Sequence, residues 1–297
     1  MHLPIIKNRN LWFSVSGVLV AAAIVVLFTC PLKFGIDFTG GSLSEIEFAG
    51  TRPAPSEVSA ELAAHGVNES VAQTIGDKEM IVRTKTLDET KHQEVRQALD
   101  KKFGGVTEHR FESVGPTVGD ELRKKAVWSI SLVLIAIALY VAYAFRKVSR
   151  PVASWKYGLA TLIVGVLHDV LLPLAAFALL GKFVNAEINS SFVAAILTVL
   201  GFSVHDTIVV FDRIRENLLK TSGSFEDIVE RSVNETISRS INTSLTAVFP
   251  LVAIFFWGGE SLHYFAFTLI IGLVAGTYSS IFLASPMLVA MQKKSGR

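Results

Sequence analysis

Long apolar runs with little or no charge recur along the chain. A helix needs roughly 20 apolar residues to cross the hydrocarbon core of a bilayer. The runs are continuous rather than alternating, so the pattern does not favour a membrane β-barrel. It predicts an α-helical membrane protein with six transmembrane helices. The predicted spans are 11–30, 126–145, 157–180, 191–211, 240–257 and 264–291.

The pattern changes between the first two runs, where short strand-like and helical stretches alternate. Helices are expected from about Ser56 to His65, with Gly66 as the stop, and from a cap at Asp88 to Phe103. The order β-α-β-β-α-β predicts one small α/β ferredoxin-like domain at 31–125. The expected strands are 43–48, 67–75, 80–86 and 106–114.

This α/β domain shows no metal-ligand or nucleophile spacing. His65, His92 and His109 are scattered single residues, and each is expected at the surface. The domain is therefore interpreted as a contact surface rather than an enzyme. Residues 115–121 contain Gly and Pro and are expected to connect it to the second span.

A further helix is expected to begin at Ser224, between the fourth and fifth spans. Apolar and small residues fall on one of its faces at helical spacing, which predicts an amphipathic helix on the inner membrane face or against the bundle. Gly272 and Gly276 in the last span permit close helix packing. Pro173 is expected to bend the third span. The sixth span is long enough to tilt, to bend at Pro286 or to begin outside the bilayer. The face of the amphipathic helix comprises Phe225, Ile228, Val229, Ser232, Val233, Thr236 and Ile237.

Composition agrees with a membrane protein. Of 297 residues, 51% are hydrophobic, and the mean hydropathy is +0.47. The net charge of +2 gives no reason to expect a nucleic-acid partner. Cys30 is the only cysteine, so no internal disulfide can form. The first apolar run is too long for a signal peptide and lacks a typical cleavage site, so it is predicted to be an anchor.

Basic residues lie beside alternate ends of the predicted spans. By the positive-inside rule, this places both termini in the cytoplasm and residues 31–125 outside. The predicted order is 1–30 (cytoplasmic N-terminus and first span), 31–125 (external domain), 126–145, 157–180 and 191–211 (second to fourth spans), 212–239 (cytoplasmic loop with the amphipathic helix), 240–257 and 264–291 (fifth and sixth spans), and 292–297 (cytoplasmic tail).

Ionisable residues inside two spans are the candidate functional groups. Asp206 follows His205 in the stretch GFSVHDTIVVFDRIREN, and Asp169 follows His168 in the third span. Charged groups at this depth are costly and usually face a partner or a water-filled path. For both acids, a structural role as a contact between helices is the alternative. Arg239 can likewise be an anchor at the interface or a cation turned towards Asp206.

Several motifs resemble the SecF family, the smaller subunits of the SecD–SecF accessory of the bacterial Sec translocase, within the resistance-nodulation-division superfamily. The motifs are GIDFTGGS after the first span, VGPTVGDEL before the second, VLHD in the third, and GFSVHDTIVVFDRIREN in the fourth. The resemblance covers essentially the whole chain. One departure is His205, because the family usually has Asn just before the intramembrane Asp.

The resemblance implies a function in protein export. Such subunits pair with SecD and use the proton-motive force to assist late steps of export through the Sec translocon. It assigns Asp206 to a proton relay with Arg239, gives Asp169 a less defined role, and leaves room for His205 to take part. Implied partners are SecD, the SecYEG channel, a YajC-like small membrane protein and an unfolded secretory polypeptide. The implied location is the bacterial inner membrane, with the proton gradient as energy source and no cofactor.

Three alternatives compete with this hypothesis. The chain could be a purely structural subunit that stabilises SecD or the translocon, with Asp206 and Arg239 as a static pair. It could be half of a small-molecule proton antiporter, although its external segment is small. An intramembrane hydrolase lacks support, because no nucleophile or two-Asp motif has suitable spacing. The chain is therefore not expected to be an enzyme.

Overall fold

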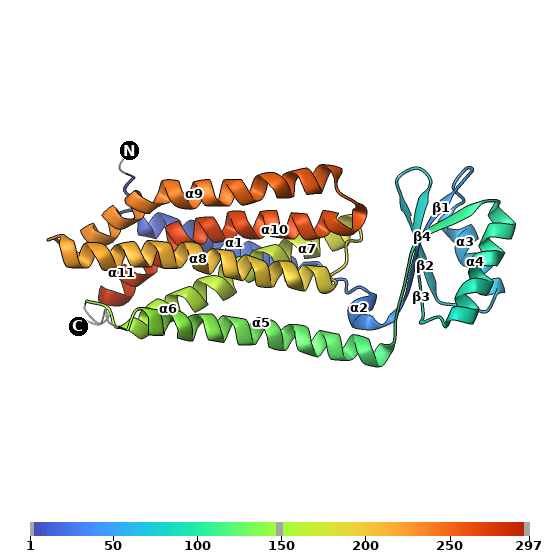
Figure 1. Cartoon of the computed structure of the whole chain (residues 1–297), viewed down its shortest axis with the longest axis horizontal. Coiled ribbons are helices and arrows are strands. Elements are labelled where there is room, and N and C mark those ends of the chain that lie inside the picture. Colours follow the sequence, from blue (N-terminus) through green and yellow to red (C-terminus); the bar gives the residue numbers. More distant parts are fainter. Residues whose placement is uncertain (1–2, 147–150, 294–297) are drawn as a thin grey trace. The chain divides into compact units, whose positions relative to one another are not determined.

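A computed structural model describes residues 3–146 and 151–293, which form two compact units (Figure 1). One unit is the α/β domain Phe34–Ala126, and the other is a helical bundle made from the rest of the described chain. Within these described residues, six helices are long and apolar enough to cross a membrane. The expected fold class, a six-helix membrane protein with one small α/β domain, is confirmed.

The α/β domain has the predicted β-α-β-β-α-β order. Its antiparallel sheet has four strands in the order β2-β3-β1-β4, and Figure 1 shows both long helices on one face of it. This is the ferredoxin-like arrangement. Its elements are β1 (Gly41–Phe48), α3 (Pro55–Ala64), β2 (Ser70–Ile75), β3 (Glu79–Thr84), α4 (Glu89–Phe103) and β4 (Val106–Val114), preceded by the short helix α2 (Ile36–Thr39).

Two local expectations for this domain were wrong. Helix α3 is capped at Ala54 rather than Ser56, because Pro55 takes the first helical position and the Glu57 side chain accepts a hydrogen bond from the Ala54 amide. His92 is buried rather than at the surface. It lies on the inner face of α4, where its ring stacks on Phe111 and its Nε2 lies 2.9 Å from a carboxylate oxygen of Glu108.

Two adjacent glycines allow the tight entry into β1. Gly40 and Gly41 have φ angles of 73° and 129°. A Cβ atom on Gly40 would lie 2.8 Å from Cα of Pro116, and one on Gly41 would lie 2.8 Å from the Thr84 carbonyl oxygen. Both the backbone conformation and the space therefore require glycine here.

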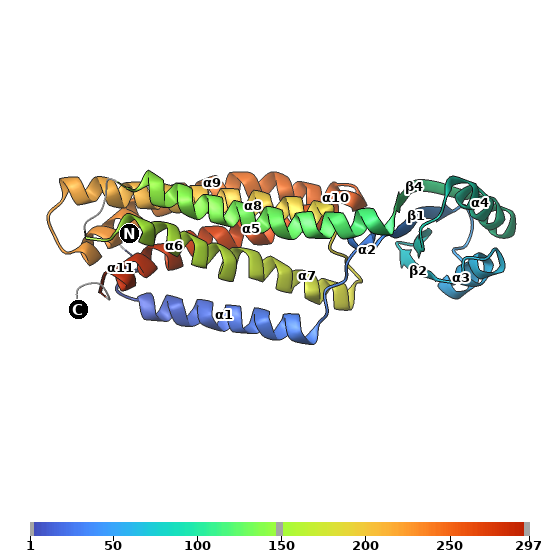
Figure 2. The same ribbon diagram turned by 90° about the horizontal axis from the view of Figure 1, so that it is seen from below.

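The bundle contains a group of three long helices and a further packed pair. Helices α8 (Ser190–Lys220), α9 (Phe225–Trp257) and α10 (Glu260–Ser279) pack against one another, and α1 (Arg9–Thr29) packs on α7 (Leu171–Phe183) (Figure 2). The predicted role of Gly272 and Gly276 is confirmed, since a Cβ on either would collide with Val199 or Ser203 of α8. Helix α5 (Pro116–Ala144) begins within the connection predicted at 115–121 and contacts α6 (Ser154–Val164) near Gly158.

Helices α8 and α9 extend well beyond the predicted apolar spans. The polar end of α8 stays helical because ion pairs at i,i+3 and i,i+4 spacing, such as Arg213–Glu216 and Glu216–Lys220, support it. The expected amphipathic helix is the first part of α9, capped by Ser224 and continuous with the fifth span. Its predicted apolar face is buried against the bundle, apart from Ile237, which is half-buried. Of the two predicted placements, the helix therefore has the one packed against the bundle rather than the one on the membrane face.

Two spans contain π-helical segments just before a proline. One is η1 (Gly165–Val170), between α6 and α7, and the other is η2 (Ser280–Ala284), between α10 and α11 (Ser285–Lys293). Proline clashes with the carbonyl four residues earlier and cannot donate to it, so the turn before Pro173 or Pro286 has to widen. The expected bends therefore take the form of local changes in helix type.

The N-terminal segment is held by the first part of α9. The Glu230 carboxylate is buried and accepts hydrogen bonds from the backbone amides of Ile5, Ile6 and Lys7 at 2.6–3.0 Å. Arg9 Nη1 lies 2.5 Å from Glu226. Ile5 and Ile6 are buried in the main core of the bundle.

Part of the sequence-based topology falls outside the described residues. These parts are the last four residues of the tail predicted at 292–297 and the basic loop positions Lys147 and Arg150. The predicted sides of the membrane and domain limits remain predictions.

Candidate functional site

Asp206 lies in the middle of α8, facing α9 and α10, and has little hydrogen bonding. Only 7% of the residue is exposed. The Ser244 hydroxyl of α9 donates to Asp206 Oδ2 across 3.5 Å, at the long limit for such a bond. Ser244 also shares a hydrogen bond with Thr277 of α10. Since a carboxylate can accept about four hydrogen bonds, Asp206 has capacity for a further partner.

Asp169 lies in η1 and is fully enclosed. It is 1% exposed. Ser203 of α8 donates a hydrogen bond to Asp169 Oδ2, and Ser279 of α10 donates to Oδ1 at 2.8 Å. Ser203 lies one turn before Asp206 on the same helix. Helix α8 therefore contacts Asp169 through Ser203 and carries Asp206 one turn later. Asp169 has two hydrogen-bond donors, whereas Asp206 has one distant donor.

His168 lies beside this second acid. It is 2% exposed, and its ring stacks on Tyr278 with 5.3 Å between ring centroids. Its Nδ1 lies 3.5 Å from Asp169 Oδ1, and neither ring nitrogen has a hydrogen-bond partner within residues 3–146 and 151–293. The Tyr278 hydroxyl shares a hydrogen bond of 2.9 Å with Ser16 of α1. Polar side chains thus extend from α1 to α9 through the bundle.

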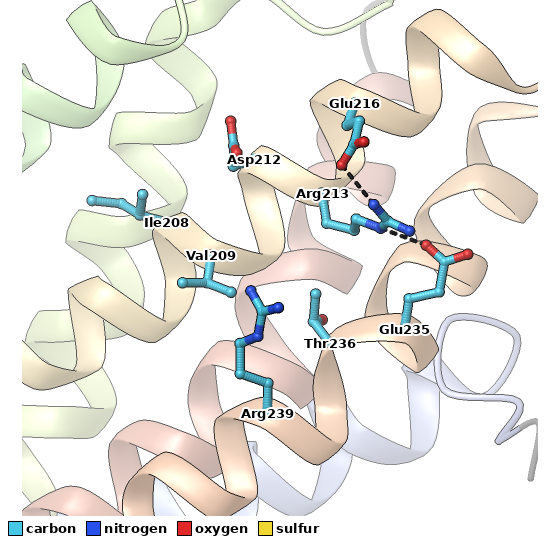
Figure 3. A pocket seen from close by; sticks show the side chains of 8 residues that line it. All are labelled: Ile208, Val209, Asp212, Arg213, Glu216, Glu235, Thr236 and Arg239. Atoms are coloured by element: carbon cyan, nitrogen blue, oxygen red, sulfur yellow. Dashed lines mark hydrogen bonds and ion pairs between the residues drawn. The ribbon is translucent and has the colours of Figure 1, made fainter.

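His205 and Arg239 lie outside this buried group. His205 is exposed on α8, whereas Asp206 beside it is buried. Arg239 is exposed on α9 and lines a cavity of about 410 Å³ between α8 and α9. Figure 3 shows its guanidinium directed towards Val209 of α8. The side chain makes no hydrogen bond or ion pair with the rest of the described chain.

Arg239 therefore lies beside the turn of α8 that follows Asp206, and the two side chains make no direct contact. Val209 follows Asp206 by three residues, which is about 4.5 Å along a helix axis. The cavity beside Val209 is lined by residues of both signs and opens at the polar ends of the two helices. The lining residues are Ile208, Val209, Asp212, Arg213, Glu216, Glu235, Thr236 and Arg239.

The sequence did not single out the hydroxyl groups around the two acids, of which Ser203, Ser244 and Ser279 donate to an acid and Thr277 bonds to Ser244. Ser203, Ser244, Thr277 and Ser279 come from three helices, and nothing in their local sequence marks them. One weak signal exists, because Ser203 precedes Asp206 by three residues and so shares its helix face. The metal-compatible group Glu47, Glu79 and His109 on the sheet was also not anticipated.

Comparisons with known proteins agree on one family. Residues 94–294 match the family described as protein export membrane protein SecD/SecF, C-terminal, and residues 25–51 match the SecD/SecF GG motif. The protein translocase subunit SecF of Thermobaculum terrenum is 42% identical over 98% of this chain and 95% of its own length. The subunit of the same name from Anaerolinea thermophila is 38% identical over 99% and 96%, respectively.

A solved structure shows the same fold. The crystal structure of SecDF, a translocon-associated membrane protein from Thermus thermophilus, superposes with a TM-score of 0.84 at 31% identity. All of this chain is covered, but only 39% of that chain. The likeness therefore concerns one part of a longer polypeptide.

Proposed function

The chain belongs to the SecD/SecF family of protein export membrane proteins, as a SecF-type translocase subunit, and we propose that it uses the proton-motive force to assist late steps of protein export. The named relatives are translocase subunits, which describes a role in transport. Because the related solved chain is much longer and is named SecDF, a separate SecD protein is the proposed partner that completes the assembly.

One observation carries this proposal: Asp206 is buried and weakly bound, and an arginine without an ion partner in the described chain lies beside the next turn. An ionised Asp206 would attract the Arg239 guanidinium whenever the two side chains approach each other. Proton uptake would remove the attraction and allow α8 and α9 to rearrange. Moving one charge through 100 mV releases about 2.3 kcal/mol, enough to bias a bundle between two arrangements.

The other candidate residues have secondary roles in this hypothesis. Asp169 of η1 is bound by Ser203 of α8, the helix that carries Asp206. It would serve either as a second proton site or as a structural contact that holds α8 in place. Its two hydroxyl donors favour the structural role. His205 faces outward, where it would be reached only by lipid or by a partner helix.

The proposed setting is the bacterial inner membrane. Both termini would be cytoplasmic, because basic residues flank the corresponding span ends. The α/β domain would be periplasmic and would grip or release the unfolded secretory polypeptide. SecD, the SecYEG channel and a YajC-like small protein are the other proposed partners. The proton gradient would be the energy source, with no cofactor.

Export of a pulse-labelled secretory protein tests the proposal in cells that carry this chain with its SecD partner. Asp206→Asn and Arg239→Ala are expected to remove the part of export that an uncoupler abolishes, while SecD still copurifies. Asp227→Asn is the matched control, since Asp227 is exposed at the start of α9 and does not line the cavity next to Arg239. Unchanged uncoupler-sensitive export by Asp206→Asn, at equal protein level, would show a purely structural subunit.

A second comparison separates a relay from a static pair. Exchange of the two residues, Asp206→Arg with Arg239→Asp, preserves opposite charges but removes the carboxylate from its position on α8. Recovery of assembly without recovery of export would support the relay. Recovery of both would favour the structural alternative.

A further inference from the structure

The carboxylates that line the cavity next to Arg239 are already engaged by other cations. Glu235 of α9 accepts a hydrogen bond from Arg213 Nε at 2.6 Å and one from Arg231 Nε at 2.8 Å. It also accepts one from the side-chain amide of Asn217 at 2.9 Å. Its two oxygens are therefore both occupied.

The two remaining carboxylates are held in the same way. Glu216 accepts from Arg213 Nη1 at 2.6 Å and from Lys220 at 2.7 Å. Asp212 pairs with Arg215 at 2.9 Å. Among the residues lining the cavity, Arg213 thus holds Glu216 with one side of its guanidinium and Glu235 with the other, and Figure 3 shows it between them.

Helix geometry would otherwise pair Glu235 with Arg239. The two residues are at i and i+4 on α9, with the acid nearer the N-terminus, which is the favourable order for such a pair. The structure has no contact between them, because Arg213 already donates a hydrogen bond to the Glu235 carboxylate. The positive charge of Arg213 also opposes any approach of Arg239 to that carboxylate.

We infer that Arg213 is a positioning residue for Arg239: it engages Glu235, the competing carboxylate one turn before Arg239 on α9, and so keeps the Arg239 guanidinium available to Asp206. This rests on the proposed proton-driven function. The planar fork of an arginine suits the task, since it can hold carboxylates on two helices at once. Removal of Arg213 would let Glu235 capture Arg239 on its own helix and lower the fraction of Arg239 that Asp206 can reach.

A double substitution distinguishes this role from that of a simple link between α8 and α9. Arg213→Gln is expected to lower the uncoupler-sensitive export rate by about two- to fivefold, which corresponds to about 0.5–1 kcal/mol. Addition of Glu235→Gln removes the competing carboxylate and is expected to restore the rate. Lys220→Gln is the matched control, because Lys220 binds Glu216 but not Glu235, and it is expected to leave the rate unchanged.

A structural link would behave differently, because loss of Glu235 cannot restore a contact that has lost Arg213. A double variant no better than Arg213→Gln would therefore overturn the inference, as would a normal rate in Arg213→Gln. If Arg213→Gln fails to accumulate in membranes, Arg213→Met replaces it in the same comparison, since methionine keeps an unbranched side chain but has neither the charge nor the hydrogen-bond donors. Failure of Asp206→Asn to affect export would reject the proposed function itself, independently of these results.

Discussion

The Ser203 hydroxyl on α8 donates a hydrogen bond to Asp169 of η1, one turn from the position where α8 carries Asp206. This contact links the two intramembrane acids through a single helix. Any movement of α8 that follows a change at Asp206 would therefore act on the surroundings of Asp169. Substitution of Ser203 therefore tests how much the stability of the protein depends on the hydrogen bonds to Asp169.

Ser203→Ala is expected to lower the free energy of unfolding by about 1–3 kcal/mol, the cost of leaving a buried acceptor without its partner. The measurement is denaturant or thermal unfolding of the purified protein in detergent. Thr198→Ala is the control, since this exposed hydroxyl of the same helix donates only to its own backbone at Ala194. Equal effects of the two substitutions would contradict a special role for the Ser203–Asp169 contact.

Gly272→Ala is expected to destabilise the bundle by about 1–3 kcal/mol through overpacking, because the added Cβ would collide with the Val199 side chain of α8. Gly201→Ala provides the comparison within α8. No atom lies within 4 Å of a Cβ built there, so alanine is expected to be neutral or stabilising. The same unfolding measurement decides between them, and a harmless Gly272→Ala would mean that α8 and α10 can separate at little cost.

Glu230→Ala is expected to release the N-terminal segment, because three backbone amides lose their acceptor at once. Each unsatisfied amide costs about 1–3 kcal/mol, so hydrogen exchange at Ile5–Lys7 should accelerate by at least about tenfold. Ser238→Ala, at an exposed position of the same helix, is the control. Exchange that stays slow in Glu230→Ala would show that burial of Ile5 and Ile6 suffices to hold the segment.

The α/β domain offers a prediction about pH. The hydrogen bond from Lys102 lowers the pKa of Glu61 below its ordinary value of 4.5, with smaller electrostatic contributions from Lys102 and His65. A lowered folded-state pKa stabilises the domain above the unfolded pKa, and the contribution is lost as the pH falls through the folded value. Lys102→Met should therefore accelerate hydrogen exchange of α3 slightly near neutral pH, and the difference should vanish well below pH 4.5.

The test uses the full chain in detergent. Lys85→Met is the control, since Lys85 pairs with Glu69 outside α3. A difference between Lys102→Met and wild type that persists at low pH would assign the effect to lost packing of the lysine stem instead.

The sequence predicted those features that repeat along the chain. Helix and strand periodicity gave the six apolar helices and the β-α-β-β-α-β order, and turn residues such as Gly66 and Asp88 marked helix ends. Asp206 and Asp169 stood out because charge is rare inside apolar runs, and Arg239 stood out because it directly precedes one. These are local properties, and they do not depend on which helices become neighbours.

Features that depend on tertiary contacts were missed. The burial of His92 requires Phe111 and Glu108 from a distant strand. The partners of Asp169 come from α8 and α10, and the engagement of Glu235 by Arg213 requires α8 and α9 to lie side by side. The continuation of α9 through residues 225–257 was also missed, because a change from polar to apolar composition resembles an element boundary even where the helix has none.

Cys30, the only cysteine, lies at the end of α1 and is 4% exposed. Thiol reagents that work from solvent would therefore react slowly with the native protein. A cysteine introduced at a strongly exposed position such as Leu219, which is 85% exposed, would be the main site of modification without prior removal of the native thiol. The chain is thus already suited to site-specific probes that report on each helix in turn.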